Sequence, residues 1–432
     1  DENLIYVNGM PIYRPFLILA GQQEGLSFVN PDLVDDITFS AGGWQPKYGD
    51  KLSSVLNITY KRPTKLAGSA TLGLLGGTAH LENASADGKV NYMIGARHKS
   101  SRYLLNTLET QGQYLPRFTD MQLMVNINLS EDSIGGKPVS QLAAIGSYAR
   151  NRYLVEPELR ETRFGTINRV FRLVVDFVGR ELLEYDTWQG GLQWSRRWNG
   201  ILQSDFIVSG LVTREREFFE VEGGYLLCDV NTNPGSDRFN QCVVERGVGS
   251  TYDYGRNSLE ATLLNAEVRN SLDWNTFNRL EFGLGVTVQD VQDLVSEFEF
   301  TDSADFVTID RQVDNEIELQ TYTVSGYVQN TTSLPNGKVL TFGSRVSYWE
   351  FGNQWLISPR LQYSFETRNW AKPIRVKMAT GLYRQAPFYR ELRDPEGNLQ
   401  EDVRAQSSFH TIVGVDYDFK AWGRPFVLSS EV

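Results

Sequence analysis

The chain lacks several features that mark common classes of protein. Its 432 residues include only two cysteines, three histidines and five methionines. No run approaches eighteen consecutive apolar residues, which excludes a transmembrane helix. No cluster of lysine and arginine offsets the formal net charge of −11, so we predict no binding to nucleic acid.

Catalytic and metal-binding patterns are also missing. The sequence has no Gly-x-Ser-x-Gly, HExxH or CxxC motif, and His80, His98 and His410 form no pair at metal-ligand spacing. The glycine-rich residues 42–51 lack the Gly-Lys-Ser/Thr ending of a phosphate loop and indicate tight turns instead. Neighbouring acidic residues are expected by chance among 53 acidic side chains. We therefore predict no enzyme activity, no metal site and no cofactor.

Period-two alternation dominates the chain from residue 66 onward. Apolar residues alternate with glycine, hydroxyl, amide or charged residues over residues 121–130, 279–289 and 321–329. This pattern predicts strands with one apolar and one polar face. Alternation alone fits both a soluble sandwich and a membrane barrel, whose strands need only about ten residues each.

Three further patterns favour the barrel. Basic residues fall on the polar parity of their strands, as they must where lipid covers the other face: Arg97, Arg279, Arg345, Arg375 and Lys377. Short turns (residues 85–88, 197–200, 274–277, 335–337 and 369–373) alternate with longer connections (residues 98–118, 218–256, 291–320 and 384–406). Tryptophan and tyrosine near the expected strand ends suit interfacial girdles.

The first 63 residues have a different texture. Residues 5–13, 36–39 and 55–60 are short runs rich in branched and aromatic residues, and glycine and proline separate them. They predict a compact mixed-sheet or α+β segment in which residues 14–28 form an irregular loop.

The motifs YVNGMPIY (residues 6–13) and NPDLVDDITFSAGGWQPKYGDKLSSVLNITYKRP (residues 30–63) carry a family resemblance. Together they resemble the C-terminal half of the plug domain of TonB-dependent outer-membrane receptors, in the version found in Bacteroidota. The match covers about sixty residues, and the following barrel texture is similar to the family's as well. Asn8 departs from the pattern, because the family more often has aspartate there.

The resemblance implies an all-β fold: a large antiparallel transmembrane β-barrel with an N-terminal plug segment. Residues 1–63 would be the C-terminal part of the plug, and residues 64–432 the N-terminal part of the barrel. We count about fourteen strands and the start of another, against about 22 in a complete plugged barrel, and so expect the chain to be incomplete at both ends.

The implied function is binding of a ligand at the cell surface and its import across the cell outer membrane of a Gram-negative bacterium. The expected partners are the TonB energy-transducing complex, a surface-exposed lipoprotein and outer-membrane lipids. The segment that contacts TonB would lie upstream of residue 1.

The resemblance also points to candidate ligand-binding residues at the plug apex and in a barrel loop. In the plug these are Arg14, Gln22 and Gln23, and in the loop Phe388, Tyr389 and Arg390. Aromatic rings can stack on a ligand, and a guanidinium can pair with an anionic group. Ordinary loop packing is the alternative for each residue.

Cys228 and Cys242 lie in one polar, glycine-rich and asparagine-rich segment. In an envelope protein they are expected to form a disulfide that staples a surface loop, and the alternative is two unpaired thiols.

Two other functions remain open. The first is a non-transporting scaffold that keeps the receptor fold within a secretion or assembly complex, which loops packed shut over the plug would favour. The second is a soluble, secreted β-rich binding module such as a carbohydrate-binding sandwich. The ligand class (siderophore, cobalamin, glycan or peptide) does not follow from the sequence.

Overall fold

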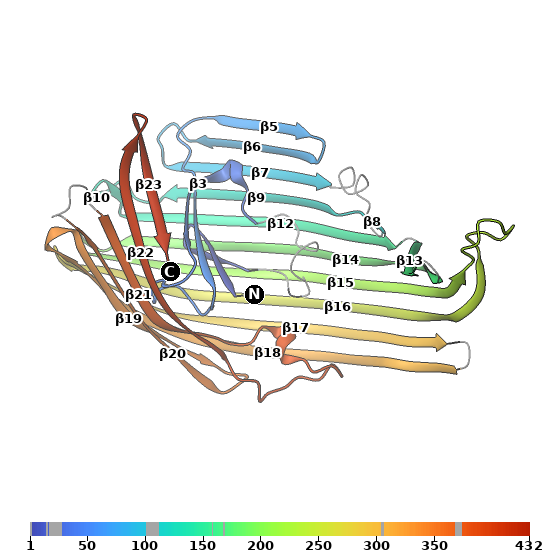
Figure 1. Cartoon of the computed structure of the whole chain (residues 1–432). Coiled ribbons are helices and arrows are strands. Elements are labelled where there is room, and N and C mark those ends of the chain that lie inside the picture. Colours follow the sequence, from blue (N-terminus) through green and yellow to red (C-terminus); the bar gives the residue numbers. More distant parts are fainter. Residues whose placement is uncertain are drawn as a thin grey trace.

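The computed structural model describes residues 2–13, 16, 28–100, 112–157, 159–166, 169–303, 306–367 and 374–432. These residues form a small sheet and a large, strongly curved antiparallel sheet that wraps around it (Figure 1). Helical structure in the described ranges is limited to three 3-10 turns: η1 (Pro31–Leu33), η2 (Pro335–Gly337) and η3 (Tyr389–Leu392). None of the described helices is long and apolar enough to cross a membrane.

The small sheet contains the three strand regions predicted near the start of the chain. Its order is β2 (Met10–Ile12), β1 (Asn3–Val7), β4 (Ser54–Tyr60) and β3 (Val34–Ser40). β1 and β4 are parallel, so this is a mixed sheet. Asn8 and Gly9 join β1 to β2 with φ of 49° and 85°, the left-handed geometry that a two-residue hairpin turn requires.

The core of the small sheet continues into the large sheet. Val7, Met10, Leu33 and Ile58 are fully buried. They pack in one cluster with four apolar residues of the large sheet, namely Met93, Met124, Ile145 and Ile207. The small sheet therefore buries its apolar side chains against the inner face of the large sheet rather than in a core of its own.

The large sheet, which we call the wall, is antiparallel throughout. Its strands are β5 (Ala67–Gly73), β6 (Gly76–Ala84), β7 (Val90–Ser100), β8 (Gly112–Tyr114), β9 (Arg117–Asn128), β12 (Ser140–Pro157), β13 (Arg160–Thr166), β14 (Arg169–Arg197), β15 (Leu202–Val230), β16 (Cys242–Asn275), β17 (Asn278–Ser303), β18 (Phe306–Leu334), β19 (Lys338–Trp349), β20 (Gln354–Glu366), β21 (Ile374–Gln385), β22 (Gln406–Ala421) and β23 (Arg424–Glu431). A separate short hairpin consists of β10 (Ser133–Ile134) and β11 (Lys137–Pro138).

The strands follow the order of a closed barrel, in which the last strand, β23, is the neighbour of the first, β5. Residue-by-residue registers run from β5 to β23, but in the described residues none joins these two end strands. Nearly every residue of both strands is exposed. We therefore regard the seam between them as open, as Figure 1 shows.

The two faces of the wall have opposite character. On the face away from the small sheet, apolar side chains are exposed: Leu284 is 71% exposed and Val328 is 50% exposed. On the inner face, polar side chains are buried, and Gln122 and Gln329 are each 1% exposed. The predicted alternation is therefore present, with its apolar side turned outward.

The turns and connections agree with the prediction only in part. Short turns join the strands at residues 85–89, 198–201, 276–277 and 335–337. The predicted turn at residues 369–373 lies outside the described residues. The connection at 384–406 is present and contains η3.

The prediction of long connections at residues 218–256 and 291–320 is wrong. β15 extends to Val230 and β16 begins at Cys242. Likewise, β17 extends to Ser303 and β18 begins at Phe306. Cross-strand pairing continues through these segments and satisfies their backbone hydrogen-bonding groups, so they extend the sheet. Their alternating aromatic and charged residues fit a sheet whose two faces are both exposed to water.

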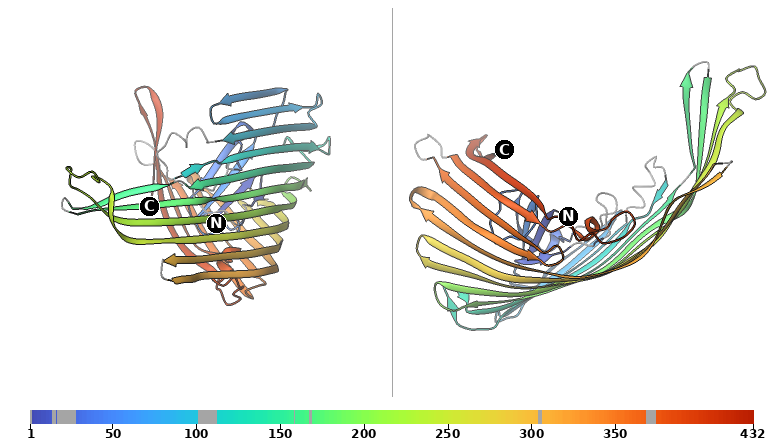
Figure 2. Two further views of the ribbon diagram at one scale, coloured as in Figure 1. Left: turned by 90° about the vertical axis from the view of Figure 1, so that its right-hand side faces the viewer. Right: turned by 90° about the horizontal axis from the view of Figure 1, so that it is seen from below.

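These extensions make the wall very uneven in height. β14 to β18 contain 26 to 34 residues, whereas β19, β20 and β21 contain 12 or 13. At about 3.3 Å per residue, a 29-residue strand is roughly 95 Å long. The green to yellow strands project far beyond their neighbours on one side of the molecule (Figure 2).

Candidate ligand-binding site

Two buried arginines of the wall hold the small sheet and its connections. Arg97 of β7 pairs with Asp120 at 2.7 Å and donates a hydrogen bond to the carbonyl of Val29 at 2.7 Å. Arg345 of β19 pairs with Asp50 at 3.1 Å. Each arginine is 8% exposed, so these interactions are little screened by water.

Residues 42–51, predicted to form tight turns, lie against β17 to β22. The side-chain oxygen of Gln329 accepts a hydrogen bond from the backbone N–H of Lys47 at 3.0 Å, and the Lys47 ammonium pairs with Glu281 at 3.3 Å. The hydroxyl of Tyr383 donates to the carbonyl of Trp44 at 3.2 Å, and the two rings are 4.4 Å apart. Side-chain contacts, and not strand pairing, thus attach this segment to the wall.

A cavity of about 260 Å³ lies between the small sheet and the inner face of the wall. Tyr6, Tyr13 and Phe16 line it from the N-terminal segment. The wall contributes polar side chains from β16 and β17, namely Asn265, Glu267, Thr287 and Gln289. A largely apolar lining with a few polar groups is typical of small-molecule sites.

The tyrosine hydroxyls of this cavity remain protonated at neutral pH. Burial raises the pKa of Tyr13 well above its usual value of 10, and it raises the pKa of Tyr6 as well. Each hydroxyl can therefore donate a hydrogen bond to an acceptor on a ligand.

Residues 386–405, which we call the lid, connect β21 to β22 and cover one side of the cavity. Tyr389 donates its hydroxyl hydrogen bond to Asp293 of β17 at 2.8 Å, and Arg393 pairs with the same carboxylate at 2.6 Å. The rings of Phe388 and Phe16 stack with their centroids 5.3 Å apart. The lid thus contacts both the wall and the N-terminal segment.

The structure places the predicted site residues in different surroundings. Phe388 and Tyr389 line the cavity, although Tyr389 is only 1% exposed and its hydroxyl is engaged with Asp293. Arg390 lines a separate cavity of about 310 Å³, together with Arg393 and Glu297. Arg14, Gln22 and Gln23 lie outside the described residues. As ligand contacts, all six remain predictions.

The sequence did not single out the polar residues of the inner face as site residues. Asn265, Glu267, Thr287 and Gln289 lie on the inward parity of β16 and β17, and the alternation of these strands is the signal that could have identified them. Asp293 shares that parity, but only the tertiary structure shows that it anchors the lid.

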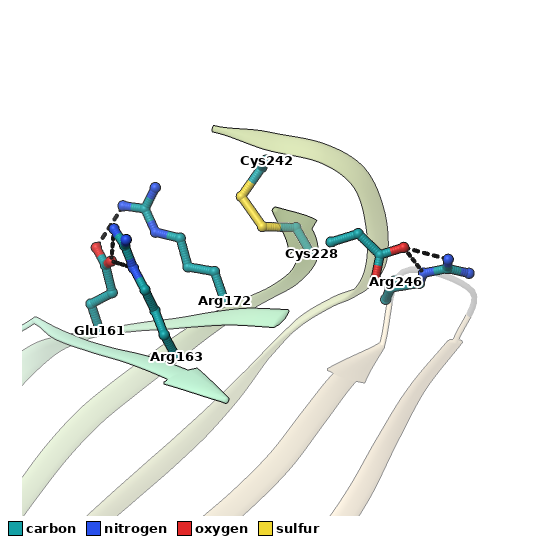
Figure 3. Close-up of a disulfide and its surroundings, with 7 residues drawn as sticks. Glu161, Arg163, Arg172, Cys228, Cys242 and Arg246 are labelled. Atoms are coloured by element: carbon teal, nitrogen blue, oxygen red, sulfur yellow. Dashed lines mark hydrogen bonds and ion pairs between the residues drawn. A yellow bond between two sulfur atoms is a disulfide. The ribbon is translucent and has the colours of Figure 1, made fainter. Parts of the chain in front are cut away.

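The sulfur atoms of Cys228 and Cys242 are bonded, with their Cα atoms 5.5 Å apart. The bond joins the end of β15 to the start of β16 at the projecting edge of the wall (Figure 3). Nearby, Arg163 and Arg172 donate hydrogen bonds to Glu161 at 2.9 and 2.6 Å. Within the described ranges, no group of three or more histidine, cysteine, aspartate or glutamate side chains could hold a metal ion.

The sequence matches no protein-family model and no curated protein. Among solved structures, the chain is similar to the outer-membrane transporter YddB from Escherichia coli, with 11% identity and a TM-score of 0.48. The match covers 97% of this chain and 60% of that one, so the chain spans less than two thirds of the length of this neighbour.

Two other solved structures have lower scores. The ferric-catecholate import receptor Fiu from E. coli matches with 7% identity and a TM-score of 0.40, over 100% of this chain and 73% of that one. The copper transporter OprC matches with 9% identity and a TM-score of 0.39, over 96% and 69%. The architecture described above is defined by the strand registers and not by these similarities.

Proposed function

We propose that this chain is part of an outer-membrane receptor that binds a ligand at the cell surface and imports it in a TonB-dependent manner. One observation carries the proposal: a cavity with a largely apolar lining and a few polar groups lies between the wall and the separately paired small sheet, under the lid. Side-chain contacts attach the small sheet to the wall. Displacement of the small sheet would therefore open a path along the wall without breaking hydrogen bonds between paired strands. The division into a plug (residues 1–63) and a barrel (residues 64–432) belongs to this proposal.

A membrane location is supported by the outward face of the wall. Large apolar side chains exposed there include Leu192, Leu264, Leu284, Val324 and Phe342. Contiguous exposed apolar surface of this extent is unfavourable in water and favourable in lipid. Buried polar side chains on the opposite face fit a polar barrel interior.

The finer features of the proposal rest on the motif resemblance alone. They are the Bacteroidota type of receptor, the TonB complex and a surface-exposed lipoprotein as partners, and contact with outer-membrane lipids. They predict that receptor and lipoprotein copurify.

A non-transporting scaffold remains the second candidate. It is favoured by the packing of the lid, since Phe388 stacks on Phe16 and Tyr389 is buried. In a scaffold this contact would be permanent, whereas in an importer a ligand would have to displace it.

Native mass spectrometry of the full-length protein, purified from outer membranes in detergent, tests the proposal. We expect the wild-type protein to retain a small molecule. Thr287→Trp should release it, because Thr287 lines the cavity. Val288→Trp is the matched control, because this neighbouring residue is 47% exposed on the outward face.

Retention by wild type and Val288→Trp but not by Thr287→Trp would support a receptor. A stable assembly of several proteins without a small molecule would overturn the receptor proposal in favour of the scaffold. Partition of the full-length protein into detergent-free buffer would contradict both.

A further inference from the structure

Arg360 of β20 is a buried cation without an acidic partner. The residue is 3% exposed, and its Nη1 donates hydrogen bonds to the carbonyls of Gln45 at 2.9 Å and Tyr48 at 3.0 Å. Its Nε and Nη2 atoms are buried and have no hydrogen-bond partner. No carboxylate in the described part of the chain lies within ion-pair distance of it.

The other cations that hold residues 42–51 and the hairpin turn differ in this respect. Arg345 pairs with Asp50, Arg269 with Glu267, and Lys47 with Glu281. These pairs balance their charges locally, whereas Arg360, where the small sheet meets β19 to β21, has no ion-pair partner among the described residues.

Two neighbouring residues, Trp44 and Ser358, also have unpartnered donors. Trp44 is 2% exposed, and its indole Nε1 has no hydrogen-bond partner. The Arg360 Cζ atom lies 5.7 Å from the centroid of the Trp44 ring and 4.3 Å from that of Tyr383. The hydroxyl of Ser358, two residues earlier on the same face of β20, is fully buried and also unpartnered.

A glycine on a neighbouring strand, Gly381, leaves room for the Arg360 side chain in the wall. Gly343 and Gly381 are its register partners on β19 and β21. A Cβ atom on Gly381 would lie 2.9 Å from the Cγ of Arg360, which is too close. The wall is thus shaped around an arginine that none of its own carboxylates neutralises.

The chemistry of this cluster favours a negative partner, because two carbonyls and two aromatic rings leave Nε and Nη2 of Arg360 without an acceptor. An unpaired buried charge is costly, and each buried donor without an acceptor adds about 1–3 kcal/mol. Two cavities lie near Arg360. Leu356 and Arg345 line the first, and Gln45 and Gln362 line the second, but Arg360 lines neither of them. Arg360 is only 3% exposed, so a partner that reaches its Nε and Nη2 atoms must be small.

We propose that Arg360 and Trp44 bind a small inorganic anion of the halide class. The anion accepts hydrogen bonds from Nε and Nη2 of Arg360 and from Nε1 of Trp44. Because Trp44 belongs to the segment that docks on the wall, the bound anion links the small sheet to β20. This site does not depend on the proposed transport function.

Bromide binding to the full-length protein in detergent tests the proposal. Thermal unfolding is measured in bromide titrations at constant ionic strength, with gluconate as the larger counter-anion. Bromide should raise the Tm of the wild-type protein, because an anion that binds only the folded state stabilises it by mass action. Arg360→Met should abolish the increase. Arg375→Met is the matched control and should keep it, because that side chain is 50% exposed and paired with Glu366.

Two further measurements apply if Arg360→Met does not fold. Trp44→Phe keeps an aromatic ring but removes the Nε1 donor, and it should weaken bromide binding about tenfold. Anomalous diffraction from wild-type crystals grown in bromide should show an ion in contact with Nε or Nη2 of Arg360. Water alone at that position at saturating bromide, or an unchanged bromide effect in Trp44→Phe, would overturn the proposal.

Discussion

At the scale of single residues, buried charges determine how the two sheets are held together. Arg345 and Asp50 come from positions 295 residues apart, and their side chains are only 10% and 20% exposed. Removal of one partner from such a pair leaves an uncompensated charge, which costs more than the pair itself contributes.

We expect Arg345→Met to lower the free energy of unfolding by about 3 kcal/mol, because Asp50 would keep only the hydrogen bond from Ser347. Urea unfolding of the detergent-solubilised protein measures the change. Arg375→Met should stay within about 1 kcal/mol of wild type, since it removes an exposed pair. Equal effects of the two substitutions would show that Asp50 is not buried against Arg345.

At the scale of elements, β13 to β18 form the projecting part of the wall (Figure 2). A disulfide and exposed ion pairs stabilise its tip: the Cys228–Cys242 bond, the Glu161 contacts with Arg163 and Arg172, and the pair of Asp229 with Arg246 (Figure 3). Cross-links of this kind constrain segments that cannot bury a core.

We predict that neither Cys228 nor Cys242 reacts in quantitative thiol labelling of the native, unreduced protein. Reduction should selectively raise hydrogen exchange in residues 229–241, because closing a loop of this size contributes about 3 kcal/mol. Exchange near Thr287 is the internal control. Labelling of both residues without reductant would contradict the bond.

The contacts of Glu161 predict that the stability of the β13–β14 hairpin depends on pH. Hydrogen bonds from Arg163 and Arg172 lower the pKa of Glu161 below its usual value of 4.5. Because the folded pKa is depressed, ionised Glu161 stabilises the β13–β14 hairpin above about pH 4.5, and this contribution is lost as the pH falls through the lowered folded pKa.

Limited proteolysis between pH 3 and pH 6 should therefore show the hairpin opening on the acid side of this window. Glu161→Gln should remove that part of the pH dependence. A wild-type profile that matches the Glu161→Gln profile would refute the role of the carboxylate.

At the scale of the whole molecule, the distribution of polar and apolar side chains is the reverse of that in a soluble protein. Apolar side chains face outward and polar side chains are buried around the small sheet. The outward face should therefore tolerate charge poorly where lipid covers it and well where strands project into water.

We expect Leu284→Arg, in the middle of the outward apolar part of β17, to cost about 2–4 kcal/mol on folding into lipid vesicles. Val248→Arg, near the projecting end of β16, should have an effect within about 0.5 kcal/mol. Both residues are exposed, at 71% and 51%, so exposure alone does not separate them. Heat-modifiable migration on gels reports the folded fraction, and similar losses for both variants would argue against a lipid boundary between them.

The sequence by itself determined the character of the two strand faces, because alternation is a local property with a period of two residues. It also located the strand regions of the small sheet, because runs of branched and aromatic residues bounded by glycine and proline are local signals. The position of the basic residues of the wall followed from the same parity.

Only the tertiary structure decided how these parts meet. The strand extensions beyond residues 218 and 291 depend on cross-strand partners that no local pattern specifies. The lid contact of Tyr389 with Asp293, 96 positions apart, depends on which side chains the fold brings together. The unpartnered guanidinium nitrogens of Arg360 depend on the fold in the same way. Long-range contacts of this kind are set by packing around the small sheet, which single-strand periodicity does not encode.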